Sequence, residues 1–569
     1  MPAGGIGEGS RPVWMAAVSA LQLQVLLGLL AAVVVLAMVA RRFRLPYPIV
    51  LVLGGLALGF VPHVPRVRLD PDVVFLVFLP PLLFNAAWAT SFRDFRANLR
   101  SIGLLAFGLV LLTTVGVAAV AHAVVPGLPW PTAFVLGAVV APTDAVAATA
   151  IMQRLGVPRR VVSVVEGESL VNDATGLVAW RFALGAAVTG VFVPWQASLE
   201  FVEAAVGGIA VGIVVGWLLA QVQLRIDDAL IEITLSFLAA YAAYLAAENL
   251  HLSGVLAVVA AGLYVGRRSP ELFSPNTRMQ GLAVWGMAVF VLNGLAFILV
   301  GLQLPGILDG LSARPVPSLV WYAAAVSLTV IAVRVAWTFP GAYLPRLLPS
   351  VRRRELLPPR RDVAVTAWSG MRGAVSLAAA LALPVTLPGG SLFPGRDLVL
   401  FVTFCVILIT LVLQGLSLPL LITGLRVTGD GREHQEEKVA RFRAIEAAEA
   451  RLAELSESDR APEGQLDLLR GYYRKRRASV ETRFGYLRHD HGGEGRGPAD
   501  GHVHVDGVDH LADHRQWQRR MHRLKLELIS AERQQVVALR DRGTISDDVM
   551  RRIERDLDLE ELHLVDAEG

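Results

Sequence analysis

Four ionisable residues lie deep within long apolar segments of this sequence: Asp144, Glu168, Asp173 and Arg372. An ionised side chain at the centre of a bilayer costs roughly 2.5–3.5 kcal/mol on insertion scales, so each of the four needs a compensating role. One role is structural, in which salt bridges hold helices together. For Glu168 and Arg372 this role is as well supported as a direct functional one, because an acid and a base can neutralise each other. We expect these two residues to form a buried ion pair.

The run from Glu166 to Asp173 presents two faces when it is wound as a helix. Glu168 and Asn172 are four residues apart and share one stripe, while Ser169 and Asp173 share the neighbouring stripe, about 100° round the helix. One stripe can therefore face Arg372 while the other faces an ion.

The second stripe offers ligands for a monovalent cation. The Ser169 hydroxyl and the Asp173 carboxylate, together with Thr143 and Asp144, are hard oxygen donors of low total charge, whereas Ca2+ normally takes more carboxylates. A carboxylate in a partly dehydrated cavity can hold either a proton or a cation. If Asp173 must be neutral before the site crosses a membrane, the two ligands compete for it and exchange follows.

The elements that carry these residues are predicted from the distribution of apolar side chains. Of the 569 residues, 54% are hydrophobic, and the mean hydropathy is +0.52, which is more than a water-soluble fold can bury. A helix needs roughly 20 apolar residues to cross the ~30 Å hydrocarbon layer. This criterion predicts an all-α polytopic membrane protein with about 13 spans, at residues 18–40, 44–62, 72–90, 99–126, 130–152, 159–187, 201–222, 228–247, 252–266, 281–306, 317–345, 363–386 and 397–424.

Arginines in the loops predict the orientation, because positive charge resists translocation. The N-terminal segment and one set of alternate loops contain Arg11, Arg66, Arg68, Arg314 and Arg396. The other set contains nineteen arginines: Arg41, Arg42, Arg44, Arg93, Arg96, Arg100, Arg154, Arg159, Arg160, Arg225, Arg267, Arg268, Arg278, Arg346, Arg352, Arg353, Arg354, Arg360 and Arg361. We therefore expect an inner-membrane protein with its N-terminus outside and its C-terminal residues in the cytoplasm.

Thirteen spans that start outside divide into six, a linker helix and six, so that the two sets enter the membrane from opposite sides. This is the inverted-repeat plan of secondary transporters. Pro142 and Asp144 lie in span five, and Gly370, Arg372 and Gly373 lie in span twelve, which are the fifth spans of their repeats. Helix breaks at such matching positions expose half-helix ends at mid-membrane, where a bare cation can be coordinated.

We divide the chain into a transmembrane antiporter domain, 1–424, and a cytoplasmic helical tail, 425–569. Charged helical patterns cover 431–460, 463–488 and 515–564 of the tail. A His- and Gly-rich stretch near 489–514 is open to metal binding or pH sensing, since His titrates near neutrality. The spacing of its histidines fits no fixed zinc pattern, and we favour a flexible loop: His489, His491, His502, His504, His510 and His514.

Other classes of function fit less well. ATP-driven pumping has no support, because no phosphate-binding loop occurs and the first lysine is Lys438. A cation channel lacks a Thr-Val-Gly-Tyr-Gly filter, and a membrane sensor that signals through the tail is a further alternative. No nucleophile with a base and an orienting group is apparent, so we expect a transporter and not an enzyme.

Three motifs resemble those of the Na+/H+ exchangers of the NhaP and NHE type: Ala141-Pro142-Thr143-Asp144, the run from Gly167 to Asp173, and the run from Gly370 to Ala374. The similarity covers residues of about 18–424 and includes Leu79 to Phe84 and Leu292 to Leu295. The tail resembles those of bacterial members more weakly.

The resemblance implies a homodimer in which a six-helix core, formed by spans four to six and eleven to thirteen, moves as an elevator. It also implies an ion- and proton-binding set, with Na+ held by Asp173, Asp144, Thr143 and Ser169. Glu168, Asn172 and Arg372 then stabilise the core. We expect exchange of Na+ or Li+ for H+ across the cell membrane, with no cofactor and no nucleic-acid partner.

The same resemblance favours electroneutral exchange of one Na+ for one H+. A related electrogenic branch has Asp at the position of Asn172 and usually Lys at that of Arg372. A K+/H+ antiporter of the same fold stays open as the main alternative, because the ligand spacings that separate the two ions are not visible in a sequence. Ala145 follows Asp144 where many relatives have Pro, which can alter the bend of span five.

Overall fold

The computed structural model describes residues 20–62, 69–190, 194–311, 314–347, 349, 357–387, 390–429, 431–458, 462–483 and 509–566. These residues form helices joined by short connections, with one isolated bridge between Thr386 and Leu392. The predicted all-α class is therefore confirmed. Of the His-rich stretch, residues 489–508 lie outside the described residues.

The helices before the tail follow the apolar segments of the sequence. Three of these helices contain a π-helical turn, at η2, η3 and η5, and continue beyond it. The bounds of all the helices before the tail are α1 (Ala20–Phe43), α2 (Tyr47–Gly59), α3 (Pro71–Val73), η2 (Val74–Phe78), α4 (Leu79–Ala89), α5 (Phe92–Ala97), α6 (Leu99–Gly103), η3 (Leu104–Leu109), α7 (Val110–Val124), α8 (Trp130–Val140), α9 (Val146–Arg154), α10 (Arg159–Thr189), α11 (Pro194–Gln223), α12 (Ala229–Asn249), α13 (Gly254–Leu272), α14 (Pro275–Leu302), α15 (Leu304–Asp309), α16 (Val316–Tyr343), η4 (Leu344–Leu347), α18 (Arg360–Trp368), α19 (Ala374–Leu381), α20 (Arg396–Ile409), η5 (Thr410–Gln414) and α21 (Gly415–Gly424).

Within the described residues, 8 helical segments are long and apolar enough to cross a membrane. They correspond to predicted spans one, three, four, seven, eight, ten, eleven and thirteen. The other predicted spans coincide with helices that are shorter, more polar or interrupted: α2, α8 with α9, α10, α13, and α18 with α19. The chain is a multi-pass membrane protein, and the count of thirteen spans stays a prediction.

Spans five and twelve are interrupted where the sequence predicts. α8 ends at Val140 and α9 begins at Val146, while α18 ends at Trp368 and α19 begins at Ala374. Proline has no backbone N–H to continue a helix, and glycine weakens one. The two breaks meet, because the Asp144 backbone N–H donates to the Met371 carbonyl over 2.8 Å.

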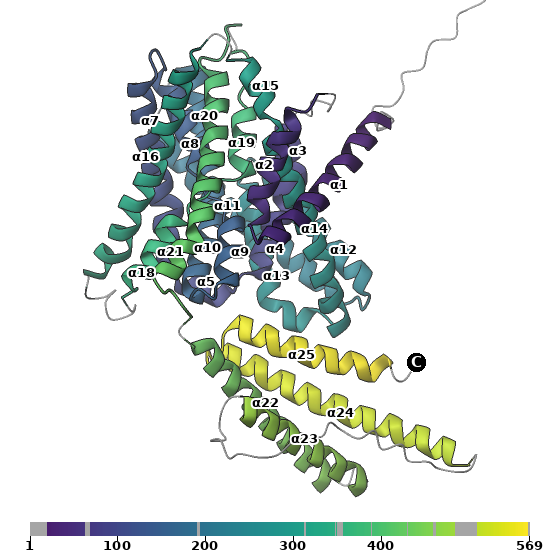
Figure 1. Cartoon of the computed structure of the whole chain (residues 1–569). Helices are drawn as coiled ribbons and strands as arrows, with labels where there is room; N and C mark the ends of the chain where they lie inside the picture. Colours follow the sequence, from purple (N-terminus) through teal and green to yellow (C-terminus); the bar gives the residue numbers. More distant parts are fainter. Residues whose placement is uncertain are drawn as a thin grey trace, which may run out of the picture.

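Packing divides these helices into two bodies. α1, α2, α4 and α11–α14 pack on one another and form what we call the scaffold body. α5–α10, α16 and α18–α21 form the core body, in which α7, α8, α10, α16 and α20 are neighbours. Figure 1 shows α7, α8, α16 and α20 of the core body on the left and α1, α2, α12 and α14 of the scaffold body on the right. Both helix breaks belong to the core body.

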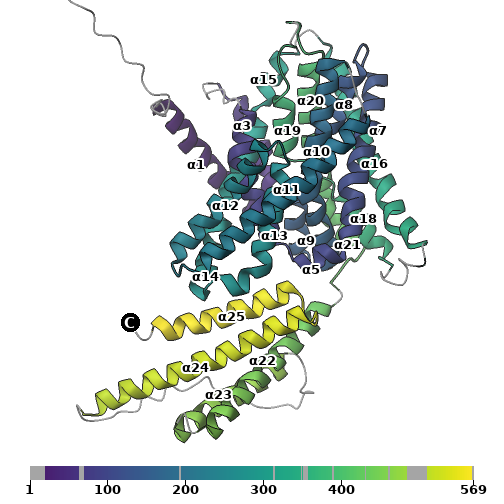
Figure 2. The same cartoon turned by 180° about the vertical axis from the view of Figure 1, so that it is seen from behind.

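The tail is a bundle of four described helices: α22 (Arg432–Glu457), α23 (Glu463–Arg483), α24 (Asp509–Asp541) and α25 (Asp547–Asp566). Its apolar side chains form two clusters of their own, one around Leu452 and Leu528 and one around Ile529 and Ile553. Figures 1 and 2 show the bundle at one end of the membrane-spanning part, with α25 nearest to it and α23 farthest away.

A buried charge cluster attaches α25 to the scaffold body. Arg278 of α14 donates to both carboxylate oxygens of Asp558, over 2.9 and 2.5 Å. Glu554 lies 3.5 Å from the same guanidinium, and the side chains of Arg278, Glu554 and Asp558 are no more than 9% exposed. The ion pair is therefore shielded from water. A charge-assisted hydrogen bond contributes more in such a buried position than at the exposed surface.

The loops that the arginine count places in the cytoplasm contact the tail. Arg93 donates to the carbonyls of Gly543 and Ile545, over 2.7 and 3.0 Å. Arg540 of the tail donates to the Arg267 carbonyl over 3.2 Å. These arginine-rich loops therefore lie on the same side as the tail, as the predicted alternation requires.

We predict that Asp558→Asn loosens α25 from α14. The buried Arg278 then loses its bidentate partner, and breaking one side of a buried pair costs up to roughly 3–5 kcal/mol, less here because Glu554 remains. Hydrogen exchange of residues 547–566 in the full-length protein should become faster. Glu446→Gln is the control, because its pair with Arg443 is 44% and 60% exposed. Unchanged protection in Asp558→Asn would show that the cluster does not hold the tail.

Candidate functional site

A cavity of about 790 Å3 lies between the core body and the scaffold body. The core body lines it with the α8–α9 break, α10 and the start of α19, and the scaffold body lines it with α4 and α14. All four proposed ion ligands are among its lining residues: Thr143, Asp144, Ser169 and Asp173. The structure therefore brings the predicted ligand set to one place.

α10 carries Asp173 to the middle of the membrane-spanning part. The helix begins at Arg159, after Pro158, and ends at Thr189, where it is followed by Gly190, whose φ of 72° suits the residue after a helix C-terminus. Asp173 is buried at 9% exposure. Among the residues that the structure describes, none donates a hydrogen bond to its carboxylate or forms a salt bridge with it. The charge of Asp144 is close enough to interact with that carboxylate. A buried carboxylate without a protein partner requires a proton or a cation.

Asp144 is held by the ends of the broken helices. Its Oδ1 accepts a hydrogen bond from the Val146 N–H over 2.9 Å, at the N-terminus of α9, where the helix dipole favours negative charge. Gly373 allows the close approach of the second break, because a Cβ atom there would collide with the Asp144 carboxylate. Ser169 lies beside them and accepts from the Ala145 N–H over 3.2 Å.

The stripe of α10 that carries Glu168 and Asn172 faces away from the cavity, as expected, but the partner of Glu168 differs from the prediction. Glu168 pairs with Arg334 of α16 through two contacts of 2.5 and 2.8 Å, and the two side chains are 1% and 0% exposed. The predicted Glu168–Arg372 pair is therefore wrong. Arg334 also donates to the Thr366 carbonyl of α18 over 3.1 Å, so the pair links α10, α16 and α18.

Asn172 and Thr143 extend this buried network. The Thr143 hydroxyl donates to Glu168 over 3.0 Å and accepts from the Asn172 side-chain amide over 2.7 Å. The Thr143 hydroxyl thus donates and accepts within the protein. The Thr143 backbone carbonyl accepts a longer hydrogen bond of 3.4 Å from the same amide, which leaves it a second lone pair for an ion. The network joins α10, α16 and the α8–α9 break.

Arg372 donates its side-chain hydrogen bonds to a helix end, and its charge also interacts with Glu168 without a direct salt bridge between the described side chains. Its Nε donates to the carbonyl of Val140, the last residue of α8, over 3.0 Å, and its guanidinium also reaches the Gly370 carbonyl. Its backbone N–H donates to the Thr410 hydroxyl in the π-turn η5 over 3.2 Å. A positive charge at a helix C-terminus is favourable, so Arg372 stabilises the α8–α9 break.

Arg334 is not among the four deep ionisable residues that the sequence singled out. In the structure α16 continues for nine residues beyond it, to Tyr343, and Arg334 is fully buried. Tyr47, Glu166 and Asn293 also line the cavity and were given no role. The position of Arg334 inside a long apolar run was the signal in the sequence that could have indicated its buried role.

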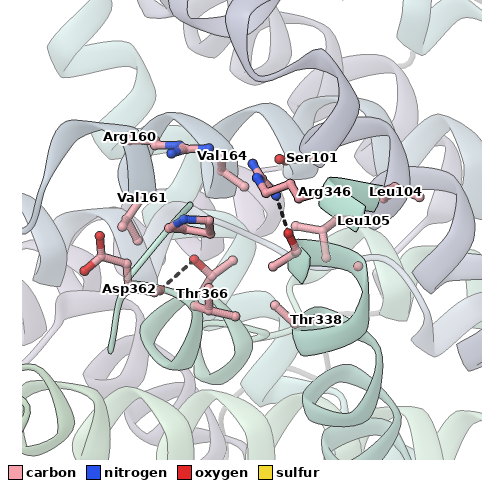
Figure 3. A pocket seen from close by; sticks show the side chains of 14 residues that line it. Ser101, Leu104, Leu105, Arg160, Val161, Val164, Thr338, Arg346, Asp362 and Thr366 are labelled. Atoms are coloured by element: carbon pink, nitrogen blue, oxygen red, sulfur yellow. Dashed lines mark hydrogen bonds between the residues drawn. The ribbon is translucent and has the colours of Figure 1, made fainter. Parts of the chain in front are cut away.

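A smaller cavity of about 70 Å3 lies between α6, η3, α10, α16 and α18. Figure 3 shows Arg346 directed toward a backbone oxygen there, and the donor and acceptor are its guanidinium and the Ala342 carbonyl. Arg160 and Asp362, also on the lining, have partners as well. This cavity lacks the unpartnered carboxylate that distinguishes the larger one.

We predict that Glu168→Gln and Arg334→Met each lower the thermal unfolding temperature in detergent. Either change leaves one charge buried without its partner, at a cost of roughly 3–5 kcal/mol. The control is Arg181→Gln, whose pair with Glu248 spans 2.8 Å but is 50% and 30% exposed, so that it should cost no more than about 1 kcal/mol. Equal unfolding temperatures of Glu168→Gln and Arg181→Gln would contradict the assignment of Glu168 and Arg334 as a stabilising buried pair.

Comparison with known proteins gives the same result as the three motifs. A profile described as sodium/hydrogen exchanger, transmembrane, matches residues 28–424. An uncharacterized Na(+)/H(+) exchanger of Mycobacterium bovis is 36% identical over 555 residues, covering 96% of this chain and 96% of that protein. A sodium, potassium, lithium and rubidium/H(+) antiporter of Bacillus pumilus is 36% identical over 413 residues, or 69% of this chain and 61% of that protein.

The fold is also similar to a solved structure. The sodium proton antiporter MjNhaP1 from Methanocaldococcus jannaschii superposes with a TM-score of 0.54 at 18% identity, over 71% of this chain and 98% of that one. At this identity the likeness concerns the fold alone, whereas the profile and the Mycobacterium relative span most of the chain. The chain is therefore a member of the sodium/hydrogen exchanger family.

Proposed function

We propose that the protein exchanges Na+ for H+ across the membrane, with Asp173 as the group that binds either ion. The observation that carries this proposal is the contrast between two acids on one helix. Glu168 is neutralised by Arg334, whereas Asp173 faces a cavity without a partner among the described residues. Asp173 is thus the carboxylate that is left to take up and release an ion.

Asp144, Ser169 and the Thr143 carbonyl complete the proposed cation site. They provide oxygen donors from two elements of the core body, and Asp144 is oriented by the Val146 N–H. A bound Na+ neutralises Asp173 in one half of the cycle and a proton neutralises it in the other. Because both ligands use the same carboxylate, binding of one excludes the other and the two fluxes are coupled.

The location of the site supports an elevator mechanism. Every proposed ligand belongs to the core body, while α4 and α14 of the scaffold body form the opposite wall of the cavity. A displacement of the core body along the scaffold body can therefore carry the intact site from one side of the membrane to the other. Such a displacement requires a scaffold body that does not move. The homodimer that the motifs imply therefore stays part of the proposal.

We propose that the tail side is cytoplasmic and the N-terminus lies outside. The arginine-rich loops contact the tail, which supports this orientation through the preference of positive charge for the cytoplasm. The cavity is lined on the tail side by Arg159, Glu166 and Asp548, so the site faces the cytoplasm in this conformation.

A wider ion range is the second candidate function. The Bacillus pumilus relative is named for sodium, potassium, lithium and rubidium, and the cavity of about 790 Å3 is larger than any of these bare ions. Selection among them then depends on how tightly the four ligands close around the ion. Comparing Na+, Li+ and K+ in one proteoliposome assay distinguishes the two candidates.

We predict that Asp173→Asn abolishes exchange in proteoliposomes while leaving a folded protein. The amide keeps the shape of the side chain but cannot exchange a proton for a cation. Asp397→Asn is the matched control, because Asp397 is 53% exposed and lies outside the cavity. Near-normal exchange by folded Asp173→Asn would end the proposal.

We predict that the exchange is electroneutral, because Asn172 stands where an electrogenic antiporter has a second acid. With K+ and valinomycin setting the voltage, the endpoint of exchange at fixed Na+ and H+ gradients should not move. An electrogenic cycle would shift it, since each net charge gains ~2.3 kcal/mol per 100 mV. A voltage-dependent endpoint would contradict one-for-one exchange, and Asp144 would then be the first carboxylate to test for a second proton.

A further inference from the structure

The tail contributes residues to the wall of the ion cavity. Glu433 of α22 and Asp548, Arg551 and Arg552 of α25 line the same cavity as Asp144 and Asp173. They lie far along the chain from the membrane helices, and α25 lies directly against that end of the bundle in Figures 1 and 2. An ion that moves between Asp173 and the tail side therefore passes along the tail.

The charges at this end of the cavity are not equally compensated. Arg552 pairs with Glu437 over 2.8 Å and with Glu433 over 3.6 Å. Asp548 lies 3.2 Å from Arg159, which also pairs with Asp94 over 2.7 Å. Most of these charges thus have an oppositely charged neighbour.

Arg551 differs from its neighbours. Its guanidinium donates to two backbone carbonyls at the C-terminus of α4, those of Ala89 and, over 3.1 Å, Trp88. No described carboxylate forms a salt bridge with it. The helix end and the two carbonyls fix the side chain in place but supply only partial negative charge. Arg551 therefore presents a positive charge to the cavity.

Glu166 presents the opposing negative charge. It lies two turns from Asp173 on α10, a separation of about 10 Å along the helix axis, and it accepts a hydrogen bond from the Gln153 side-chain amide over 3.4 Å. Its carboxylate interacts electrostatically with Asp548, Arg159 and Arg551. An arriving cation is attracted by Glu166 and repelled by Arg551.

We propose that α25 forms the tail-side wall of the ion entrance and that Arg551, opposed by Glu166, determines which cations reach Asp173 and at what concentration. The inference rests on the proposed antiport function and adds residues to it that belong to the tail. Electrostatic repulsion scales with the charge of the ion, so Arg551 disfavours a divalent cation by the square of the factor that applies to Na+. Loss of the Arg551 charge should therefore favour Mg2+ more strongly than Na+.

The test uses the full-length chain in everted membrane vesicles, which expose the tail side, and measures the apparent KM for Na+ and its inhibition by Mg2+. We expect Arg551→Gln to lower the KM for Na+ about two- to fourfold, the effect of one unit charge about 10 Å from the ion in a hydrated site, and to make Mg2+ inhibit at about four- to sixteenfold lower concentration. Glu166→Gln should raise the KM by a similar factor. Both effects should shrink at high ionic strength.

Two control variants distinguish the effect of the Arg551 charge from the effect of a weaker attachment of the tail. Arg551→Lys retains the charge and should keep the wild-type KM. Arg540→Gln removes a tail contact, the bond to the Arg267 carbonyl, but Arg540 does not line the cavity, so its KM should also be that of the wild type.

An unchanged KM in Arg551→Gln, or the same change in Arg551→Gln and Arg540→Gln, would overturn the inference in favour of a tail that acts only as a mechanical clamp. These outcomes are read from vesicles in which the wild type exchanges Na+ for H+. Absence of exchange by the wild-type protein would instead refute the proposed function.

Discussion

The buried pair between Glu168 and Arg334 is the interaction on which the rest of the site depends. Both side chains are fully shielded, and neither could stay ionised alone at that depth. Their pairing joins α10 to α16 and orients Thr143 and Asn172 through hydrogen bonds. With Glu168 neutralised in this way, Asp173 on the adjacent stripe is left as the carboxylate that needs an ion from outside the protein.

Two interrupted helices impose the second constraint. Each break exposes one helix C-terminus and one N-terminus, and these ends carry opposite partial charges. Arg372 compensates the C-terminus of α8, and Asp144 compensates the N-terminus of α9. The breaks also contact each other through the Asp144 N–H and the Met371 carbonyl, so the backbone that surrounds the site is held by its own polar groups. A cation can then replace water there without disordering the chain.

The tail adds a further set of charges to a site that is otherwise inside the membrane-spanning part. Its contacts reach both bodies, with Arg278 and Arg267 on the scaffold side and Arg93 and Arg159 on the core side. Among the tail acids in this interface, burial raises the pKa of Glu554, and Arg278 opposes the shift. Attachment of α25 therefore has an electrostatic component as well as packing, and it brings charged tail residues to the lining of the cavity.

The sequence by itself determined the helical membrane fold, the positions of both breaks and the division of α10 into two stripes. These are local properties, since apolar run length, Pro142, Gly370 and a spacing of four residues act within one element. Only the tertiary structure decided that Glu168 pairs with Arg334 and not with Arg372, and that Arg551 lines the cavity. The sequence shows which charges are buried but not which of them meet, because that depends on where α10, α16 and α25 lie in the folded chain.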